Sequence, residues 1–223
     1  MSYVASSDGS SLYLLSAEFI IAAYVQLRDR MIQLLRELPA EDATITVPHC
    51  PEWTVQETVS HMVGVPEALL SGDLEGIASD AWTQRQVERH RGDSLADLAN
   101  AWEASSEKFL AMLPMVPLPA LTQMVFDVSS HEHDVRHAVG QPGARDSLAV
   151  SVGVSFMKHA IDSRKDLDVE IANSWKVSDF DFFRSLGGRR SAEQISSVGI
   201  DIEFAQALLR PMPISIPATS ITE

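Results

Sequence analysis

The segment from Leu12 to Leu38 runs without Gly or Pro and carries apolar side chains along nearly its whole length. At 1.5 Å per residue this segment predicts a single helix about 40 Å long. Because its apolar band is wide, we expect the helix to contact other helices on more than one side. Pro39 follows and favours the end of the helix there. A chain that begins in this way is typical of a helical bundle.

Three later segments have the same helical periodicity and are bounded by Gly or Pro: 54–70, 94–113 and 119–139. Thr54 and Glu57 have the spacing of a capping box at the start of the second helix. Strand patterns are too sparse for a sheet-based fold. The sequence therefore predicts a mainly α, up-and-down four-helix bundle. Residues 71–93, with a short polar helix near 80–91, form its one long crossover.

The C-terminal part of the sequence predicts shorter elements. A helix is expected at 147–164 and another near 201–209, and Ser178 and Ser191 are candidate caps for two more. The run Leu167–Ile171 alternates apolar and acidic residues, which predicts a lone strand. We therefore expect a flexible tail at 1–11, a metal-binding helical bundle at 12–145, and a helical extension that includes one short strand at 146–223.

Composition excludes several classes of protein. The net charge of −14 argues against a nucleic-acid binder and against binding to anionic lipid. The single cysteine, Cys50, cannot form an intrachain disulfide, which favours a reducing compartment. The N-terminus lacks the basic start of a secretory signal, and the apolar run 12–25 is too short to span a bilayer. We expect a soluble cytoplasmic protein without membrane or nucleic-acid partners.

Histidines concentrate near the end of the fourth long segment. Asp127 and His131 are four residues apart, so on a helix they share a face and can bind one divalent ion. His133 and His137 have the same spacing on another face, and spacing alone does not choose between the pairs. His61, in the middle of the second helix, is a third candidate ligand or a core histidine. Three ligands would leave an open position, as in catalytic sites.

Asp134 and Arg136 follow His131 in the sequence and are candidates for a role beside such a site. Asp134 is placed either to orient a ligand imidazole by a hydrogen bond or to pair with Arg136 at the end of the bundle. Arg136 is a candidate for binding a substrate carboxylate, because a guanidinium binds carboxylates bidentately. The alternative for Arg136 is a structural place near a helix C-terminus, where the dipole favours cations.

Four other residues have simpler interpretations. Trp53 precedes the cap of the second helix and is expected to pack at the helix entrance. Cys50 lies in a Pro-bounded loop with only His49 as a neighbouring base, so we expect no catalysis by its thiol and find no firm reason for it to point at an ion. Arg189 and Arg190 are interpreted as a solvated helix start, with anion binding as the alternative.

Two motifs carry a family resemblance. The segment from Cys50 to His61 (CPEWTVQETVSH) and the segment from Asp127 to Gly140 resemble the signatures of the DinB-like metal-binding bundles of actinobacteria. These belong to the family of the mycothiol-dependent maleylpyruvate isomerase. The resemblance covers about residues 12–145. The run from Phe183 to Gln194 also looks like the ending of an uncharacterised branch of this family.

The resemblance implies a metal site formed by His61, Asp127 and His131. The characterised isomerase has Glu where this chain has Asp127, so the ion is expected to sit differently or to bind more weakly. His133 and His137 then face solvent or lie just outside the ligands. The ligand types favour zinc, with nickel as the alternative.

The resemblance also implies mycothiol as a thiol cofactor or co-substrate. The implied reaction is isomerisation or S-transfer on a small electrophilic substrate. A metal-binding module without turnover, acting as a sensor or interaction domain, is the competing hypothesis. Residues 146–223 do not match the longer C-terminal domain of the isomerase, so the substrate stays open. The chain is compatible with a homodimer.

Overall fold

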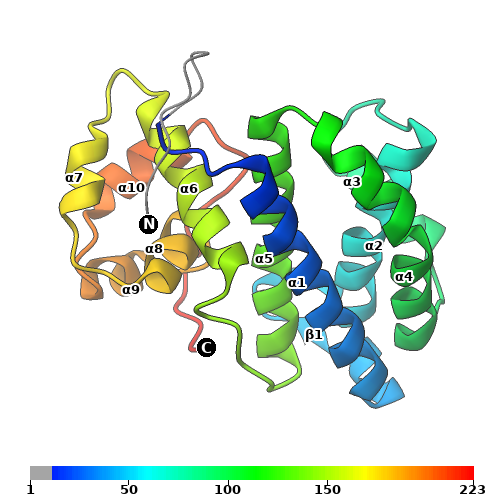
Figure 1. Ribbon diagram of the computed structural model, residues 1–223. Coiled ribbons are helices and arrows are strands. Elements are labelled where there is room, and N and C mark those ends of the chain that lie inside the picture. The colour runs from blue at the N-terminus through cyan, green and yellow to red at the C-terminus, as the bar shows by residue number, and fades with distance from the viewer. Residues whose placement is uncertain (1–11) are drawn as a thin grey trace. The chain divides into compact units, whose positions relative to one another are not determined.

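The computed structural model describes residues 12–223, and the predicted tail at 1–11 lies outside the described residues (Figure 1). Helices dominate this part of the chain, whose strands form one two-stranded sheet, so the predicted mainly α fold is confirmed. None of the helices described here is long and apolar enough to cross a membrane.

The elements follow one another in the order helix, hairpin, then helices. The helices are α1 (Ala17–Glu37), α2 (Val55–Ser71), α3 (Asp80–Arg89), α4 (Leu95–Met112), α5 (Leu118–Ala138), α6 (Leu148–Asp162), α7 (Val169–Ser174), α8 (Asp179–Leu186), α9 (Ala192–Ser197) and α10 (Ile202–Leu209). The strands are β1 (Thr46–Val47) and β2 (Cys50–Thr54), and short 3-10 helices occupy Ala40–Thr44 and Leu113–Met115.

Local capping fixes where α2 begins and ends. The Thr54 hydroxyl accepts from the backbone N–H of Glu57 at 3.2 Å, and the Glu57 carboxylate accepts from the backbone N–H of Thr54 at 2.9 Å. This is the predicted capping box, in which two otherwise unpaired N–H groups are satisfied. Gly72 ends the helix with a φ of +74°, a left-handed conformation that favours glycine.

Two local predictions need correction. The expected strand at 167–171 is wrong, because this stretch enters helix α7. There the Asp168 carboxylate accepts from the backbone N–H of Glu170 at 2.9 Å and acts as the helix cap. The connection at 40–53 contains an antiparallel hairpin, in which Thr46 pairs with Thr54 and Val47 is fully buried. Strand β1 has only 2 residues and β2 has 5, which is too short for the alternation of apolar and polar residues that predicts a strand.

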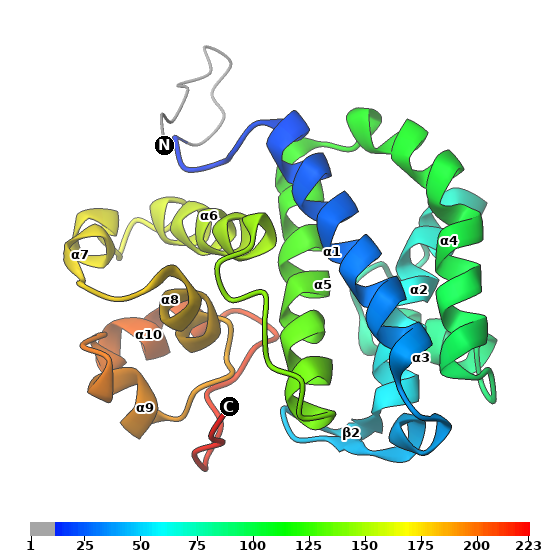
Figure 2. The ribbon, with the colours of Figure 1, turned by 60° about the horizontal axis from the view of Figure 1, so that its bottom comes forward.

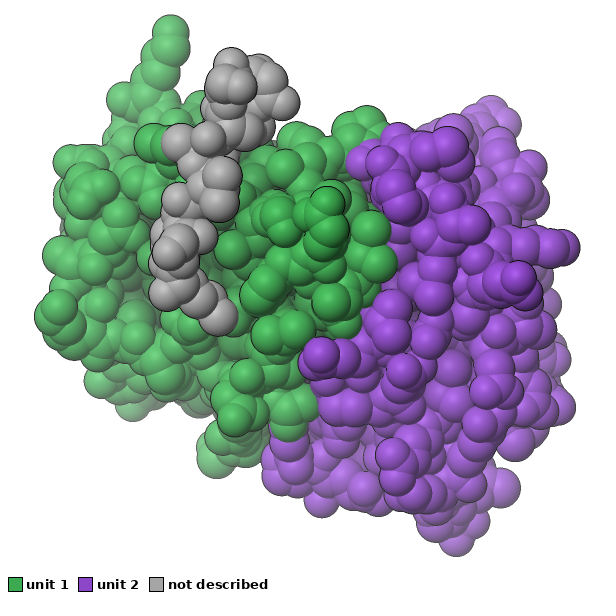
Figure 3. All heavy atoms as spheres, viewed as in Figure 1, with its two compact units in different colours: residues 1–23, 117–130, 144–223 green, residues 24–116, 131–143 purple. Residues whose placement is uncertain are grey.

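The described residues form two compact units, each treated by itself (Figure 3). Unit 1 comprises 12–23, 117–130 and 144–223, and unit 2 comprises 24–116 and 131–143. Helices α1 and α5 each contribute residues to both units.

The core of unit 2 is built around aromatic side chains. Helices α3 and α4 both pack against α2 (Figure 2). The Trp102 indole N–H donates to the Tyr24 hydroxyl at 3.0 Å, and the Tyr24 and Phe109 rings meet edge to face. All three side chains are buried, and burial raises the pKa of Tyr24. The polar atoms of Tyr24 and Trp102 thus satisfy each other inside the core.

A buried histidine joins α3 to α2. His90, at the end of α3, has its Nε2 atom 2.9 Å from the Glu67 carboxylate of α2 and its Nδ1 atom 2.9 Å from Asp93. The hydrogen bond to Glu67 raises the pKa of His90 above its ordinary value of 6.5. The same bond lowers the pKa of Glu67. Protonated His90 therefore holds two carboxylates at once.

We expect His90→Gln to destabilise the protein most at about pH 6 and least at high pH. A histidine with a raised pKa contributes stability that is fully present below its unfolded pKa and is lost as pH rises through its folded pKa. The measurement is the urea midpoint of wild type and variant across pH. His159→Gln is the control, because burial lowers the pKa of His159 and its effect should have the opposite pH trend. A pH-independent His90→Gln effect would contradict the expectation.

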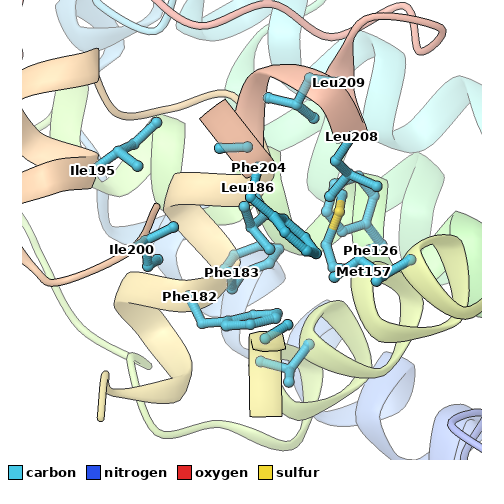
Figure 4. Close-up of a cluster of buried hydrophobic side chains, with 14 of the residues drawn as sticks. Phe126, Met157, Phe182, Phe183, Leu186, Ile195, Ile200, Phe204, Leu208 and Leu209 are labelled. Atoms are coloured by element: carbon cyan, nitrogen blue, oxygen red, sulfur yellow. The ribbon is translucent and has the colours of Figure 1, made fainter. Parts of the chain in front are cut away.

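The core of unit 1 gathers side chains from α5, α6 and α8 to α10 (Figure 4). The Phe183 ring meets the Phe126 ring edge to face at 5.7 Å. Gly153 of α6 lets α8 come close, because a Cβ atom there would lie 2.4 Å from the Phe183 ring. These phenylalanines hold α8 against α6.

The last residues of the chain are bound to α8 and α9 by buried polar contacts. Arg184, with a fully buried side chain, donates to the carboxylate of Glu223 through Nε at 2.9 Å and also through Nη2. The Nη2 atom of Arg190 lies 3.3 Å from the same carboxylate. The interpretation of Arg190 as a solvated residue is wrong, since only 12% of its side chain is exposed.

Candidate metal centre

Three predicted ligands come from two helices. His61 is in the middle of α2, where only 5% of it is exposed, and His131 of α5 is 6% exposed. Asp127, half-buried, lies one turn before His131 on the same helix. The His61 and His131 rings are 5.2 Å apart and nearly perpendicular.

The donor atoms of this group converge. One ligand atom from each of His61, Asp127 and His131 lies within 4.8 Å of the other two. Two imidazole nitrogens and one carboxylate oxygen form a donor set suited to zinc and related divalent ions, and a set of three leaves one tetrahedral position open. The residues therefore fit the divalent ion that the family resemblance implies.

Gln86 of α3 fixes the orientation of His61. Its Oε1 atom lies 2.6 Å from Nδ1 of His61, and 1% of the residue is exposed. An amide oxygen can only accept, so Nδ1 carries the proton and the lone pair is on Nε2. Gly64 makes this approach feasible, because a Cβ atom there would lie 2.5 Å from Cβ of Gln86. Ligand histidines commonly donate their second N–H in this way.

Asp134 and Cys50 lie at the other ligand histidine. The Asp134 carboxylate, fully buried, is 3.4 Å from Nδ1 of His131. The Cys50 sulfur is 3.6 Å from that carboxylate and 4.0 Å from the same Nδ1. The sequence contains no firm reason for Cys50 to approach these residues, yet strand β2 places it against His131. Asp134 has the position of a group that orients an imidazole.

Trp53 covers both histidines. Its ring centroid lies 5.5 Å from that of His61 and 5.9 Å from that of His131. The sequence predicted that Trp53 packs at the entrance of α2, and the residue does directly precede the helix cap Thr54. The prediction did not include its contact with the two histidines. The half-buried indole limits the access of water to the two imidazoles.

The remaining charged and imidazole groups of α5 face other partners. Glu132, fully buried, accepts from Arg30 of α1 at 2.8 Å and from Nε of Arg136 at 3.1 Å. His133 is 4% exposed, so the alternative that it faces solvent is wrong. The half-buried His137 packs its ring 5.2 Å from that of His49.

These features define a helical bundle with a candidate metal site. Over residues 24–138 the chain matches the family model described as the mycothiol maleylpyruvate isomerase N-terminal domain. The match spans more than half of the chain, and the chain therefore belongs to this family. The family resemblance predicted from the two motifs is confirmed, and with it an association with mycothiol and metal binding. No curated protein and no solved structure matches the chain.

Proposed function

We propose that His61, Asp127 and His131 hold a divalent ion, with zinc favoured and nickel as the alternative. The observation that carries the proposal is the convergence of their three ligand atoms within 4.8 Å in a member of this family. The hydrogen bond from His61 to Gln86 supports it, because it leaves Nε2 as the coordinating atom. The characterised isomerase has Glu at the position of Asp127. Because the side chain of Asp is one methylene shorter, we expect this chain to bind the ion more weakly.

The proposed activity is a mycothiol-dependent isomerisation or S-transfer on a small electrophilic substrate. A bound divalent ion would supply a Lewis acid that lowers the pKa of a thiol at its open position. Gln86 holds the His61 imidazole in its tautomer, Asp134 lies beside the His131 imidazole, and Trp53 packs near both rings. Arg136 is the candidate for a substrate carboxylate, although its Nε already donates to Glu132.

The test compares two variants in a thiol-conjugation assay with and without mycothiol. Cys50→Ser is expected to keep most thiol-dependent activity, because the nucleophile is the external thiol. His61→Ala is expected to abolish it, because a ligand is lost. A dead Cys50→Ser protein with an active His61→Ala protein would overturn the mechanism. A metal-loaded wild type with no thiol-dependent turnover would favour the binding module instead.

We expect Gln86→Met to weaken zinc binding about 10–100-fold, the usual cost of losing a group that orients a ligand histidine. The stability of the apoprotein should change little, because removal of the buried Nε2 of Gln86, which has no hydrogen-bond partner, offsets the loss of the acceptor for Nδ1 of His61. Zinc affinity is measured by competition with a chelator, and stability by urea unfolding. A Gln84→Met variant, on the exposed face of α3, is the control. A large loss of apoprotein stability with unchanged affinity would show a purely structural role.

A further inference from the structure

A second group of metal-binding side chains shares His131 with the site above. Cys50 of β2, His131 and Asp134 of α5 each offer a ligand atom within 4.8 Å of the other two. All three belong to unit 2. The proposed function assigns this group no ion, because Asp134 only orients His131 there and Cys50 has no part.

The distances within the group resemble the edges of a coordination tetrahedron. With zinc bonds of 2.0–2.3 Å, a nitrogen and an oxygen on one ion lie about 3.3 Å apart, and a sulfur lies about 3.5 Å from either. The observed separations are 3.4 Å from Nδ1 of His131 to Asp134, 3.6 Å from sulfur to Asp134 and 4.0 Å from sulfur to Nδ1. Small side-chain rotations would therefore suffice to bind an ion.

The contact between His131 and Asp134 is longer than an ordinary hydrogen bond. The separation of 3.4 Å between Nδ1 of His131 and the Asp134 oxygen exceeds the usual N–H···O range of 2.7–3.2 Å. Asp134 is fully buried and accepts from the Cys50 thiol at 3.6 Å, and buried carboxylates either are paired in this way or coordinate metals. Cys50 is half-buried, so an ion can reach the group through its exposed side.

We propose that Cys50, His131 and Asp134 form a second binding position for a borderline-soft divalent ion such as Zn²⁺. The sulfur, nitrogen and oxygen donors match that class, whereas Mg²⁺ and Ca²⁺ prefer oxygen alone. The ion replaces the proton of the Cys50 thiol, which is released to solvent, and binds Nδ1 of His131 in the tautomer that carries its proton on Nε2. When the first site is filled through Nε2 as well, that second proton is also released, and His131 bridges the two positions.

Cobalt(II) titration of the whole protein distinguishes the two positions. Only the second position contains a thiolate, so only there does bound cobalt give a near-ultraviolet sulfur-to-metal charge-transfer band. We expect the band in wild type and in His61→Ala, and its loss in Cys50→Ser together with one equivalent of bound cobalt. Asp134→Asn should weaken the band. Wild type saturated with cobalt but lacking the band would overturn the proposal while leaving the first site intact.

Thiol labelling gives a second measurement that needs no variant. Because Cys50 is the single cysteine, alkylation reports on this position alone. Zn²⁺ is expected to slow alkylation of Cys50 at least about tenfold, and a chelator should restore the rate. Mg²⁺ at the same concentration is the control and should have no effect. Alkylation equally fast with and without Zn²⁺ would overturn the second position. Protection that persists in His61→Ala would show that it fills independently of the first site.

Discussion

Replacing Glu223 with Gln is expected to destabilise unit 1 by about 3–5 kcal/mol, the usual cost of removing one partner of a buried ion pair. The Arg184 side chain is fully buried, and Glu223 accepts from two of its nitrogens. Arg190 also lies beside this carboxylate, with its pKa lowered mainly by burial. Loss of the negative charge leaves two buried guanidinium groups less well compensated. The measurement is the free energy of unfolding in urea.

Glu203→Gln is the matched control. Glu203 is exposed in the first turn of α10, so its substitution should change the free energy of unfolding by less than about 0.5 kcal/mol. Equal stabilities of the two variants would show that the contacts of residues 220–223 contribute little. In that case the hydrogen bond between Gln194 and the carbonyl of Ile221 would also be dispensable.

Elements that are set by neighbouring residues were predictable from the sequence. Each cap at Thr54, Ser178 and Ser191 is a side chain that accepts from a backbone N–H three residues later, so the signal lies within four residues. The prediction of a strand at 167–171 failed because the same acidic side chain is compatible with two structures. It fits an alternating strand, yet Asp168 caps a helix that buries Ala172 in the core of unit 1.

The candidate ligands could be proposed from the sequence, and their surroundings could not. Asp127 and His131 are one helical turn apart, and His61 stands in a recognisable motif. Gln86 reaches His61 because Gly64 lets α3 approach α2 closely. The residues around Gln86 in the sequence form no pattern that predicts this contact. Cys50 and Trp53 reach the histidines because the hairpin of β1 and β2 turns back, and that pairing is tertiary structure.

His131→Ala is expected to remove nearly all bound metal, with a loss of zinc affinity greater than about 100-fold. His131 is the one residue that contributes to both convergent groups, so its loss breaks the first site and the second position together. The fold should survive, because a chain of this length buries enough apolar surface to fold without an ion. Metal content is measured by elemental analysis and helix content by circular dichroism.

His137→Ala is the matched control on the same helix. Its ring packs against His49 and belongs to neither convergent group, so its metal content should equal that of wild type. Because His61→Ala breaks only the first site, this variant should keep the ion bound by Cys50. The metal contents of the His61, His131 and His137 variants together show which residues bind each ion. Full metal occupancy in His131→Ala with native helix content would remove both sites. Loss of helix in that variant would show instead that the ion supports the bundle.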